Sequence, residues 1–324
     1  MARDSFDAAV RGATISAQTW MGFRGCHGCR NSSYNHRLWS GYLGGTDNWS
    51  SQLGRESLRP SQLPSIREFM MRDHTEDVRR LNYVFNRNGD AGLEDMPPVP
   101  FTGDIDAMEA GDCVCVLGIN PHWPAESRGA HQNEIIPFRK MVSALQKGDE
   151  RHYQSFIDSR LGYFRGKMAN WKHYKPIGLR YAEHFFRGQS YQSVWKRNAF
   201  ALDILPYWST GTGKISNSRL RKNISSDPAT ASHQLMMSEI IQFTNPSLIH
   251  VNGTTARRLV EEFYCPEPLE YRGQEHSLMF GHARFGERMV EVMAHQQLGS
   301  RNGPSSKHWP GFIEELRKWR GGIN

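Results

Sequence analysis

The sequence contains no apolar run long enough to cross a membrane and no signal-peptide pattern after its opening Met-Ala-Arg-Asp. Hydrophobic residues make up only 38% of the 324 residues, so much of the chain must lie at the surface or in loops. Aromatic residues, at 11%, are too frequent for a disordered chain. We therefore expect a soluble, cytoplasmic protein with one large α/β domain plus an extension, and no membrane partner.

Cysteine is scarce, with five residues in the chain. Only Cys26-His27-Gly28-Cys29 has the spacing of a metal-ligand pair, and the second spaced pair that a closed zinc site needs does not follow. Cys113 and Cys115 point to one face of a strand and fit small core side chains. We expect reduced cysteines and no bound metal, with zinc at Cys26 and Cys29 as the alternative.

Acidic residues are outnumbered, which gives a net charge of +7 and suits a polyanionic partner. The excess is concentrated between Arg160 and Arg197, where nine Lys or Arg residues and nine aromatic residues accompany one acid, Glu183. Basic side chains neutralise phosphates and aromatic rings stack on bases, so this segment is predicted to contact nucleic acid. The alternative is a solvated basic face over an aromatic core.

The most informative stretch runs from Cys113 to Trp123. Its first five residues, Cys113 to Leu117, predict a strand that is buried on both faces, as in a parallel sheet. The strand ends at Gly118 and presents Asn120 on a rigid Asn-Pro turn. Ligands of parallel sheets bind at the carboxyl ends of strands, so Asn120 is a candidate functional residue. The alternative is a turn that only ends the strand.

Residues 1–100 are predicted to form an irregular, partly helical N-terminal extension, with one helix near 65–85 that starts at a capping box of Ser65 and Glu68. The stiff segment Pro97 to Pro100 marks the expected boundary to a second domain, residues 101–324. In that domain short strands alternate with helices, which predicts a three-layer α/β/α fold with a four-stranded parallel sheet. Besides 113–117, strands are expected at 200–206, 247–251 and 289–294, and helices at 133–145, 232–243, 256–263 and 310–319.

Four segments, in this order, resemble the uracil-DNA glycosylase superfamily over roughly residues 105–320. Gly118-Ile119-Asn120-Pro121 is similar to the first active-site motif of its mismatch-specific branches. Phe200–Asp203 matches the strand that ends in a base-binding residue, usually asparagine, and Val251–Ala256 resembles the third strand and its helix start. Met293–Gln296, followed by 300–303, resembles the His-Pro-Ser segment and DNA-entry loop, although the proline is missing.

The resemblance implies an enzyme that flips a nucleotide out of single- or double-stranded DNA and hydrolyses its N-glycosidic bond, without a metal, a nucleotide or another cofactor. Asn120 would hold the attacking water, and His295 would donate a hydrogen bond to the departing base. An amide is not a general base, so Glu126 and Glu134 are candidates for that role. Alternatively, His295 is a core histidine.

The remaining implied site residues fall into two groups. The base-binding group is Gly118, Ile119, Pro121, His122, Asp203, Tyr207 and Trp208. The DNA-binding group is Lys172, Lys175, Arg219, Arg221, Asn252, Thr254, Leu298, Ser300 and Arg301. Leu298 is the nearest candidate for a wedge into the duplex, and the alternative is a surface apolar residue.

Asp203 departs from the family pattern in an informative way. An ionised carboxylate only accepts hydrogen bonds, so it suits the exocyclic amine of cytosine better than O4 of uracil. His122 stands where relatives often have glycine, or a tyrosine that blocks the 5-position of the base. We therefore expect a modified cytosine as substrate, such as the glucosylated 5-hydroxymethylcytosine that some relatives remove from phage DNA in antiviral defence. The alternative for Asp203 is a cap on the following loop.

The leading hypothesis is thus a monofunctional DNA glycosylase that leaves an abasic site. Two alternatives stay open: excision repair of uracil or another deaminated base, and a catalytically silent DNA-binding module with the same fold.

Overall fold

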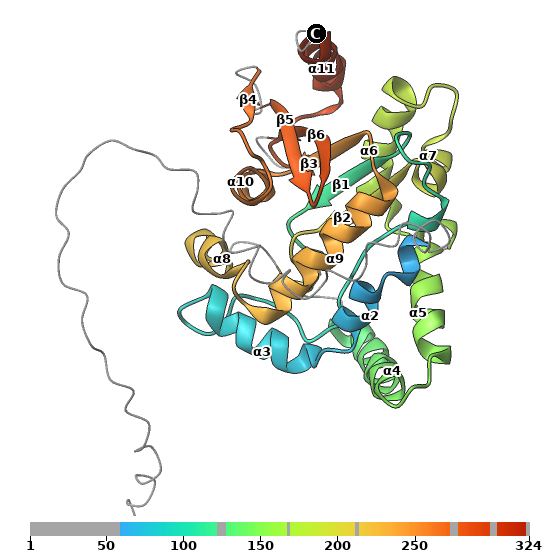
Figure 1. The fold of residues 1–324 in the computed structure, drawn as a ribbon, viewed down its shortest axis with the longest axis vertical. Coiled ribbons are helices and arrows are strands. Elements are labelled where there is room, and N and C mark those ends of the chain that lie inside the picture. The colour runs from blue at the N-terminus through green and yellow to red at the C-terminus, as the bar shows by residue number, and fades with distance from the viewer. Residues whose placement is uncertain are drawn as a thin grey trace, which may run out of the picture. The chain divides into compact units, whose positions relative to one another are not determined.

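The computed structural model describes residues 59–121, 128–166, 169–210, 214–272, 278–298 and 303–321, without the side chains of 128–134 (Figure 1). Several sequence predictions lie outside the described residues. These are the Cys26–Cys29 metal pair, His122, Ser300 and Arg301, and the general-base candidate Glu126, together with the side chain of the second candidate, Glu134.

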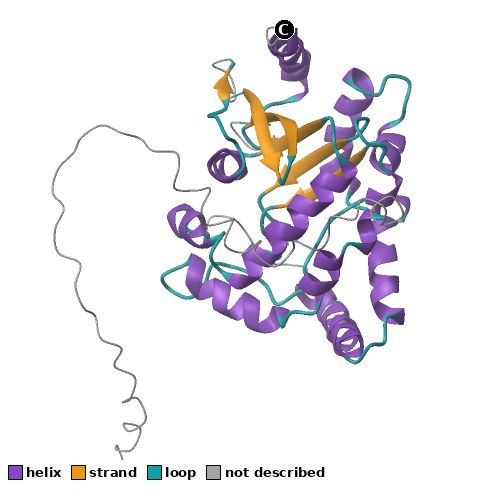
Figure 2. Ribbon diagram, in the orientation of Figure 1, coloured by secondary structure: helices purple, strands orange, loops and turns teal. Residues whose placement is uncertain are grey.

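A mixed six-stranded sheet forms the centre of the described structure (Figure 2). Its order is β2-β1-β3-β6-β5-β4, and the first four strands run parallel. These four are the predicted strands, observed as β1 (Val114–Gly118), β2 (Ala199–Asp203), β3 (Leu248–Asn252) and β6 (Arg288–His295). The prediction of a four-stranded sheet is corrected by two antiparallel strands, β5 (Met279–Phe285) and β4 (Glu270–Tyr271).

Helices cover both faces of this sheet because its parallel strands are apolar on both sides. Along β1, Cys115 and Leu117 belong to one hydrophobic core, and Val114 and Val116 belong to another. The first core is covered by α2 (Pro64–Met70), α3 (His74–Phe85), α4 (Arg128–Gln146), α5 (Arg151–Leu161), α8 (Asn217–Asn223), α9 (Pro228–Thr244) and α10 (Thr254–Phe263). The second is covered by α6 (Trp171–His184), α7 (Tyr191–Arg197) and α11 (Trp309–Gly321). None of the helices in the described ranges combines the length and apolarity needed to span a bilayer.

The predicted helix over 65–85 is in fact two helices, α2 and α3. Helix α2 starts one residue before Ser65, because Pro64 occupies the first helical position, where its missing N–H costs nothing. The predicted capping box at Ser65 and Glu68 is therefore wrong. The cap belongs to α3 instead, where the Asp73 carboxylate accepts a hydrogen bond from the Glu76 N–H at 3.0 Å.

Residues on both sides of the boundary expected near residue 100 share one hydrophobic core. Phe69 and Leu81 are fully buried in the same cluster as Leu117 and Ile240. The Pro97–Pro100 segment lies along the loop after β2, where the Val99 N–H donates to the Pro206 carbonyl at 2.8 Å. Helices α2 and α3 are thus part of one compact unit with the sheet.

Candidate functional site

The last residues of the four parallel strands form a row at the carboxyl edge of the sheet. Gly118 pairs with Asp203, and Asn252 pairs with His295. All four lie on the face covered by α6, α7 and α11, since each follows by two residues a position that faces that side. The predicted residues therefore share one face and one edge, which is where parallel sheets bind ligands.

Asn120 lies just beyond β1 with its amide fixed in orientation. Its Nδ2 donates to Ser209 Oγ at 2.6 Å and lies 3.2 Å from the Pro121 carbonyl and 3.3 Å from the Tyr207 carbonyl. These acceptors turn Asn120 Oδ1 the other way. Oδ1 is buried, and no described residue donates to it. A buried acceptor without a donor is costly, so this oxygen is suited to bind a water molecule or a ligand N–H.

Ser209 is a site residue that no sequence pattern indicated. It is buried, its hydroxyl accepts from Asn120, and its backbone N–H donates to the Pro121 carbonyl at 3.0 Å. Ser209 therefore fixes both the amide of Asn120 and the turn that bears it.

Asp203 packs directly against Gly118. A Cβ added to Gly118 would lie 2.4 Å from Asp203 Oδ1, so the carboxyl group occupies space that only glycine leaves open. Within the described part of the chain, the carboxyl has no hydrogen bond and no ion pair. Burial raises its pKa to about 7. The sequence prediction assumed an ionised carboxylate, and this is corrected: near neutral pH the acid and the carboxylate are both populated.

Helix α9 positions the end of β2 from the other side. His233 Nε2 donates to the Asp203 carbonyl at 2.7 Å, and Gln234 Nε2 donates to the Ile204 carbonyl at 2.8 Å. Burial lowers the pKa of His233 to about 4, so its ring is neutral at pH 7. These two bonds fix the backbone from which the Asp203 side chain projects.

His295 is fully buried and is one member of a hydrogen-bonded chain. Its Nδ1 lies 2.6 Å from the Gln296 carbonyl, and its Nε2 lies 2.5 Å from His250 Nε2, whose ring is bonded in turn to Tyr181 Oη. The Gln296 carbonyl can only accept, so His295 bears its proton on Nδ1. His250 then donates from Nε2 to His295 and accepts from Tyr181 at Nδ1.

The hydrogen bonds that join His295 to its neighbours restrict what its ring can contact. Both ring nitrogens are engaged within the protein, and the side chain has no exposed surface to offer a base. Burial, with a smaller contribution from His295, lowers the pKa of His250 well below its ordinary value, so His250 is neutral. A direct hydrogen bond from His295 to a base is thus corrected to a buried role among Tyr181, His250 and Trp309.

The turns after β3 and β6 are bonded to each other. Asn252 Oδ1 accepts from the Leu298 N–H at 2.9 Å, and the Gly253 N–H donates to the His295 carbonyl at 3.0 Å. Leu298, the predicted wedge, is partly buried and packs against the second core. Thr254 is the first residue of α10 and is partly exposed.

Tyr207 and Trp208 face the segment before residue 100. Tyr207 is fully buried, with its hydroxyl 3.2 Å from His74 Nδ1, and Trp208 Nε1 donates to the Pro97 carbonyl at 2.9 Å. Their predicted base-binding role is corrected for Tyr207, which has no accessible surface. A cavity of about 220 Å³ nearby, between the start of α3 and α4, is lined by His74, Pro97 and Phe138 and by none of the predicted base-binding residues.

The predicted DNA-binding cations divide into two kinds. Lys172 and Lys175 on α6 are exposed, and neither forms an ion pair with a described residue. Arg219 donates to the Tyr83 and Val84 carbonyls at the end of α3, and Arg221 pairs with Glu262 on α10. The two arginines therefore fasten α8 to its neighbours.

Most aromatic rings of the segment 160–197 pack against one another. Phe164 lies 4.7 Å from Trp195 between ring centroids and 4.9 Å from Tyr174, and both Phe164 and Trp195 are buried. For these rings the alternative of an aromatic core under a basic face is the one observed.

Among the described residues, no cluster of three or more His, Cys, Asp or Glu side chains is arranged to bind a metal ion. No model of a known protein family matches the sequence, and no curated protein matches it.

Proposed function

We propose that this protein is a DNA glycosylase that removes a cytosine-type base from DNA by hydrolysis of the N-glycosidic bond. The observation that supports it most is a pair of groups at one sheet edge. Asn120 Oδ1 is a buried acceptor, and neither it nor the carboxyl of Asp203 has a hydrogen-bond partner among the described residues. The order of the four strand-end motifs, which resembles the uracil-DNA glycosylase superfamily with its three-layer α/β/α fold, adds to this support.

In this proposal Asn120 orients the attacking water. A flipped nucleotide that loses its base leaves an oxocarbenium-like sugar, which water attacks without full deprotonation. The water therefore needs orientation more than it needs a strong base. Asn120 Oδ1 accepts a hydrogen bond from the water and so directs a lone pair of the water oxygen to the sugar. Ser209 keeps the amide in the required orientation.

Asp203 recognises the base. The neutral acid offers one O–H donor beside one acceptor, which matches the N3 acceptor and N4–H₂ donor of cytosine. The carboxylate matches the amine alone. For the biological setting we keep the expectation from the resemblance, namely removal of a modified cytosine such as glucosylated 5-hydroxymethylcytosine from phage DNA.

Uracil removal is the second candidate function, and the raised pKa of Asp203 favours it too. A neutral carboxyl can donate to O4 of uracil and accept from its N3–H, as an asparagine does. A direct comparison of the two bases as substrates separates the two functions.

We expect the purified protein to release a free base from one or more cytosine derivatives and to leave an abasic site. The substrate panel consists of matched oligonucleotides with uracil, cytosine, 5-hydroxymethylcytosine or its glucosylated form, scored by strand cleavage at abasic sites and by mass spectrometry of the released base. Activity should survive chelator treatment. Release of uracil alone would support the repair function, and DNA binding without release of any base would support the silent module.

DNA affinity is expected to depend on the exposed lysines of α6. The double variant Lys172→Ala/Lys175→Ala should lower the slope of log affinity against log salt by about one unit for each phosphate that the protein no longer neutralises. The matched control is Lys140→Ala/Lys147→Ala, on α4 and directly after it, which removes the same charge from the opposite face of the sheet. Equal effects of the two double variants would show that only net charge matters.

A further inference from the structure

We propose that Asp203 is also a catalytic acid: its neutral carboxyl donates a proton to N3 of the cytosine-type base as the glycosidic bond breaks. This inference rests on the proposed function, because it concerns the same site and the same base. It goes further in that it assigns to one residue the activation of the leaving group, a role that otherwise falls to a hydrogen-bond donor at O2.

The position of the carboxyl supports this role. Asp203 ends β2, in register with Gly118, and its carboxyl lies over the glycine at the edge where Asn120 is presented. His233 and Gln234 donate to the backbone carbonyls of Asp203 and Ile204 and not to the carboxyl group. Both carboxyl oxygens are therefore without a partner among the described residues. A carboxyl that served only to cap the following loop would accept hydrogen bonds from that loop, and none is found among the described residues.

The titratable groups around Asp203 are uncharged. Tyr174 on α6 lies on the same face of the sheet, Cys115 on β1 points to the opposite face, and His233 on α9 donates to the Asp203 backbone carbonyl. Burial raises the pKa of Cys115 and of Tyr174 and lowers that of His233 to about 4, so all three are neutral at pH 7. No described lysine or arginine pairs with the carboxyl. Burial without a compensating cation therefore raises the pKa of Asp203 to about 7, which is a suitable value for a general acid.

The proposed step balances without any co-reactant except water. The C1′–N1 bond breaks, and its electron pair stays on the base. The Asp203 O–H bond breaks as N3 takes the proton, so cytosine leaves as a neutral N3–H tautomer instead of an anion. Water adds its oxygen to C1′ and releases one proton to solvent, and solvent returns one proton to the Asp203 carboxylate. The sum is nucleotide plus water giving abasic sugar plus free base.

This role separates cytosine from uracil by chemistry as well as by binding. N3 of cytosine has a lone pair that can take the proton, whereas N3 of uracil already bears hydrogen. The acid therefore assists only a cytosine-type leaving group, and the assistance should vanish as Asp203 ionises.

The experiment measures single-turnover base release from pH 5 to pH 9, on the cytosine derivative that the panel shows to be released fastest. For the wild type we expect a constant rate below about pH 7 and a tenfold fall per pH unit above it, because only the protonated acid donates. Asp203→Asn should react on the order of 10²–10⁴-fold more slowly, with no fall above pH 7. The control Glu109→Gln, which removes an exposed carboxyl, should keep the wild-type profile.

A second arm uses a 3-deazacytosine oligonucleotide, in which a C–H replaces N3. The wild type should lose rate on this probe to about the level of Asp203→Asn, and the variant should lose little more, because both changes remove the same proton transfer. This arm needs only the wild type if the variant fails to fold. A flat wild-type profile to pH 9, or an equal loss on the probe in both proteins, would overturn the acid role while base release still supports a glycosylase. Release of no base at all would overturn the proposed function itself.

Discussion

Asn120→Ala is expected to slow base release on the order of 10²–10³-fold, the usual cost of losing one preorganised polar group beside the reacting atoms. The variant removes Oδ1, the acceptor that is proposed to orient the attacking water. Single-turnover rates on the best substrate of the panel measure the loss. DNA affinity should stay at the wild-type level, because Asn120 is proposed to contact the water and not the phosphates.

Two matched variants of Ser209 test how Asn120 is oriented. Ser209→Ala removes the hydroxyl that lies 2.6 Å from the Asn120 amide nitrogen, so the amide can rotate and the rate should fall, but by less than in Asn120→Ala. Ser209→Thr keeps a hydroxyl and should restore most of the rate. For Asn120→Ala, a rate of base release equal to that of the wild type would contradict the water-binding role. A loss of DNA affinity as large as the loss of rate would place Asn120 in DNA binding instead.

The four parallel strands were predictable because each is a short apolar run that is buried on both faces. The antiparallel strand β5 was missed, although its sequence contains a hairpin signal. Gly286-Glu287 is a two-residue connection between β5 and β6, and Gly286 adopts the positive φ of +59° that such a tight turn requires. With this signal the sheet would have been expected to be mixed.

Some residues at the candidate site take their position from their own strand, whereas others are placed by contacts with residues that are distant in sequence. The positions of Asn120 and Asp203 at the sheet edge were predictable, since each follows from where its own strand ends. Ser209 and Tyr181 were not, because they meet Asn120 and His250 across 89 and 69 residues of sequence. The same limit explains His295: the sequence placed it correctly at the end of β6, but only the fold reveals that His250 occupies its Nε2.

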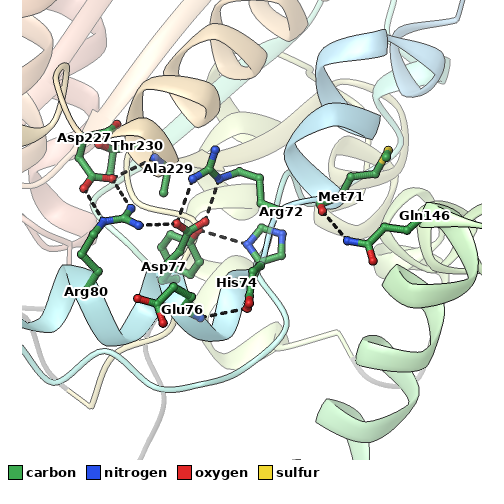
Figure 3. Close-up of polar contacts among 12 residues, drawn as sticks. Met71, Arg72, His74, Glu76, Asp77, Arg80, Gln146, Asp227, Ala229 and Thr230 are labelled. Atoms are coloured by element: carbon green, nitrogen blue, oxygen red, sulfur yellow. Dashed lines mark hydrogen bonds and ion pairs between the residues drawn. The ribbon is translucent and has the colours of Figure 1, made fainter.

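A charge network joins α3 to the start of α9, the helix that bears His233 (Figure 3). Asp77 on α3 accepts two hydrogen bonds from Arg72, at 2.8 and 2.9 Å, and pairs with Arg80, which also binds Asp227 through two bonds. Asp227 caps α9 by accepting from the Ala229 N–H at 2.9 Å. Because α9 bears His233, which bonds to Asp203, the network supports the backbone of the site from residues before 100.

Asp77→Ala is expected to lower the free energy of unfolding by about 3 kcal/mol, because it leaves Arg72 without its buried carboxylate partner and removes one of the two carboxylates that bind Arg80. The value lies at the low end of the range for buried pairs, since the side chains of Arg72 and Arg80 are 25% and 34% exposed. Glu76→Ala on the same helix removes a surface pair and is the matched control, with an expected loss of about 0–1 kcal/mol. Chemical denaturation of both variants measures the difference.

The pH dependence of the difference in unfolding free energy between the wild type and Asp77→Asn tests whether the stabilisation by Asp77 is electrostatic. Burial alone would raise the pKa of Asp77, but the hydrogen bonds and charges of Arg72 and Arg80 outweigh it and hold the pKa below its ordinary value. The stabilisation is therefore present at neutral pH and is lost as the pH falls below the ordinary aspartate pKa of about 3.9. The gap between wild type and Asp77→Asn should be widest near pH 7 and should close in acid. A gap that stays constant to low pH would mean that the ionisation of Asp77 contributes nothing to the stability.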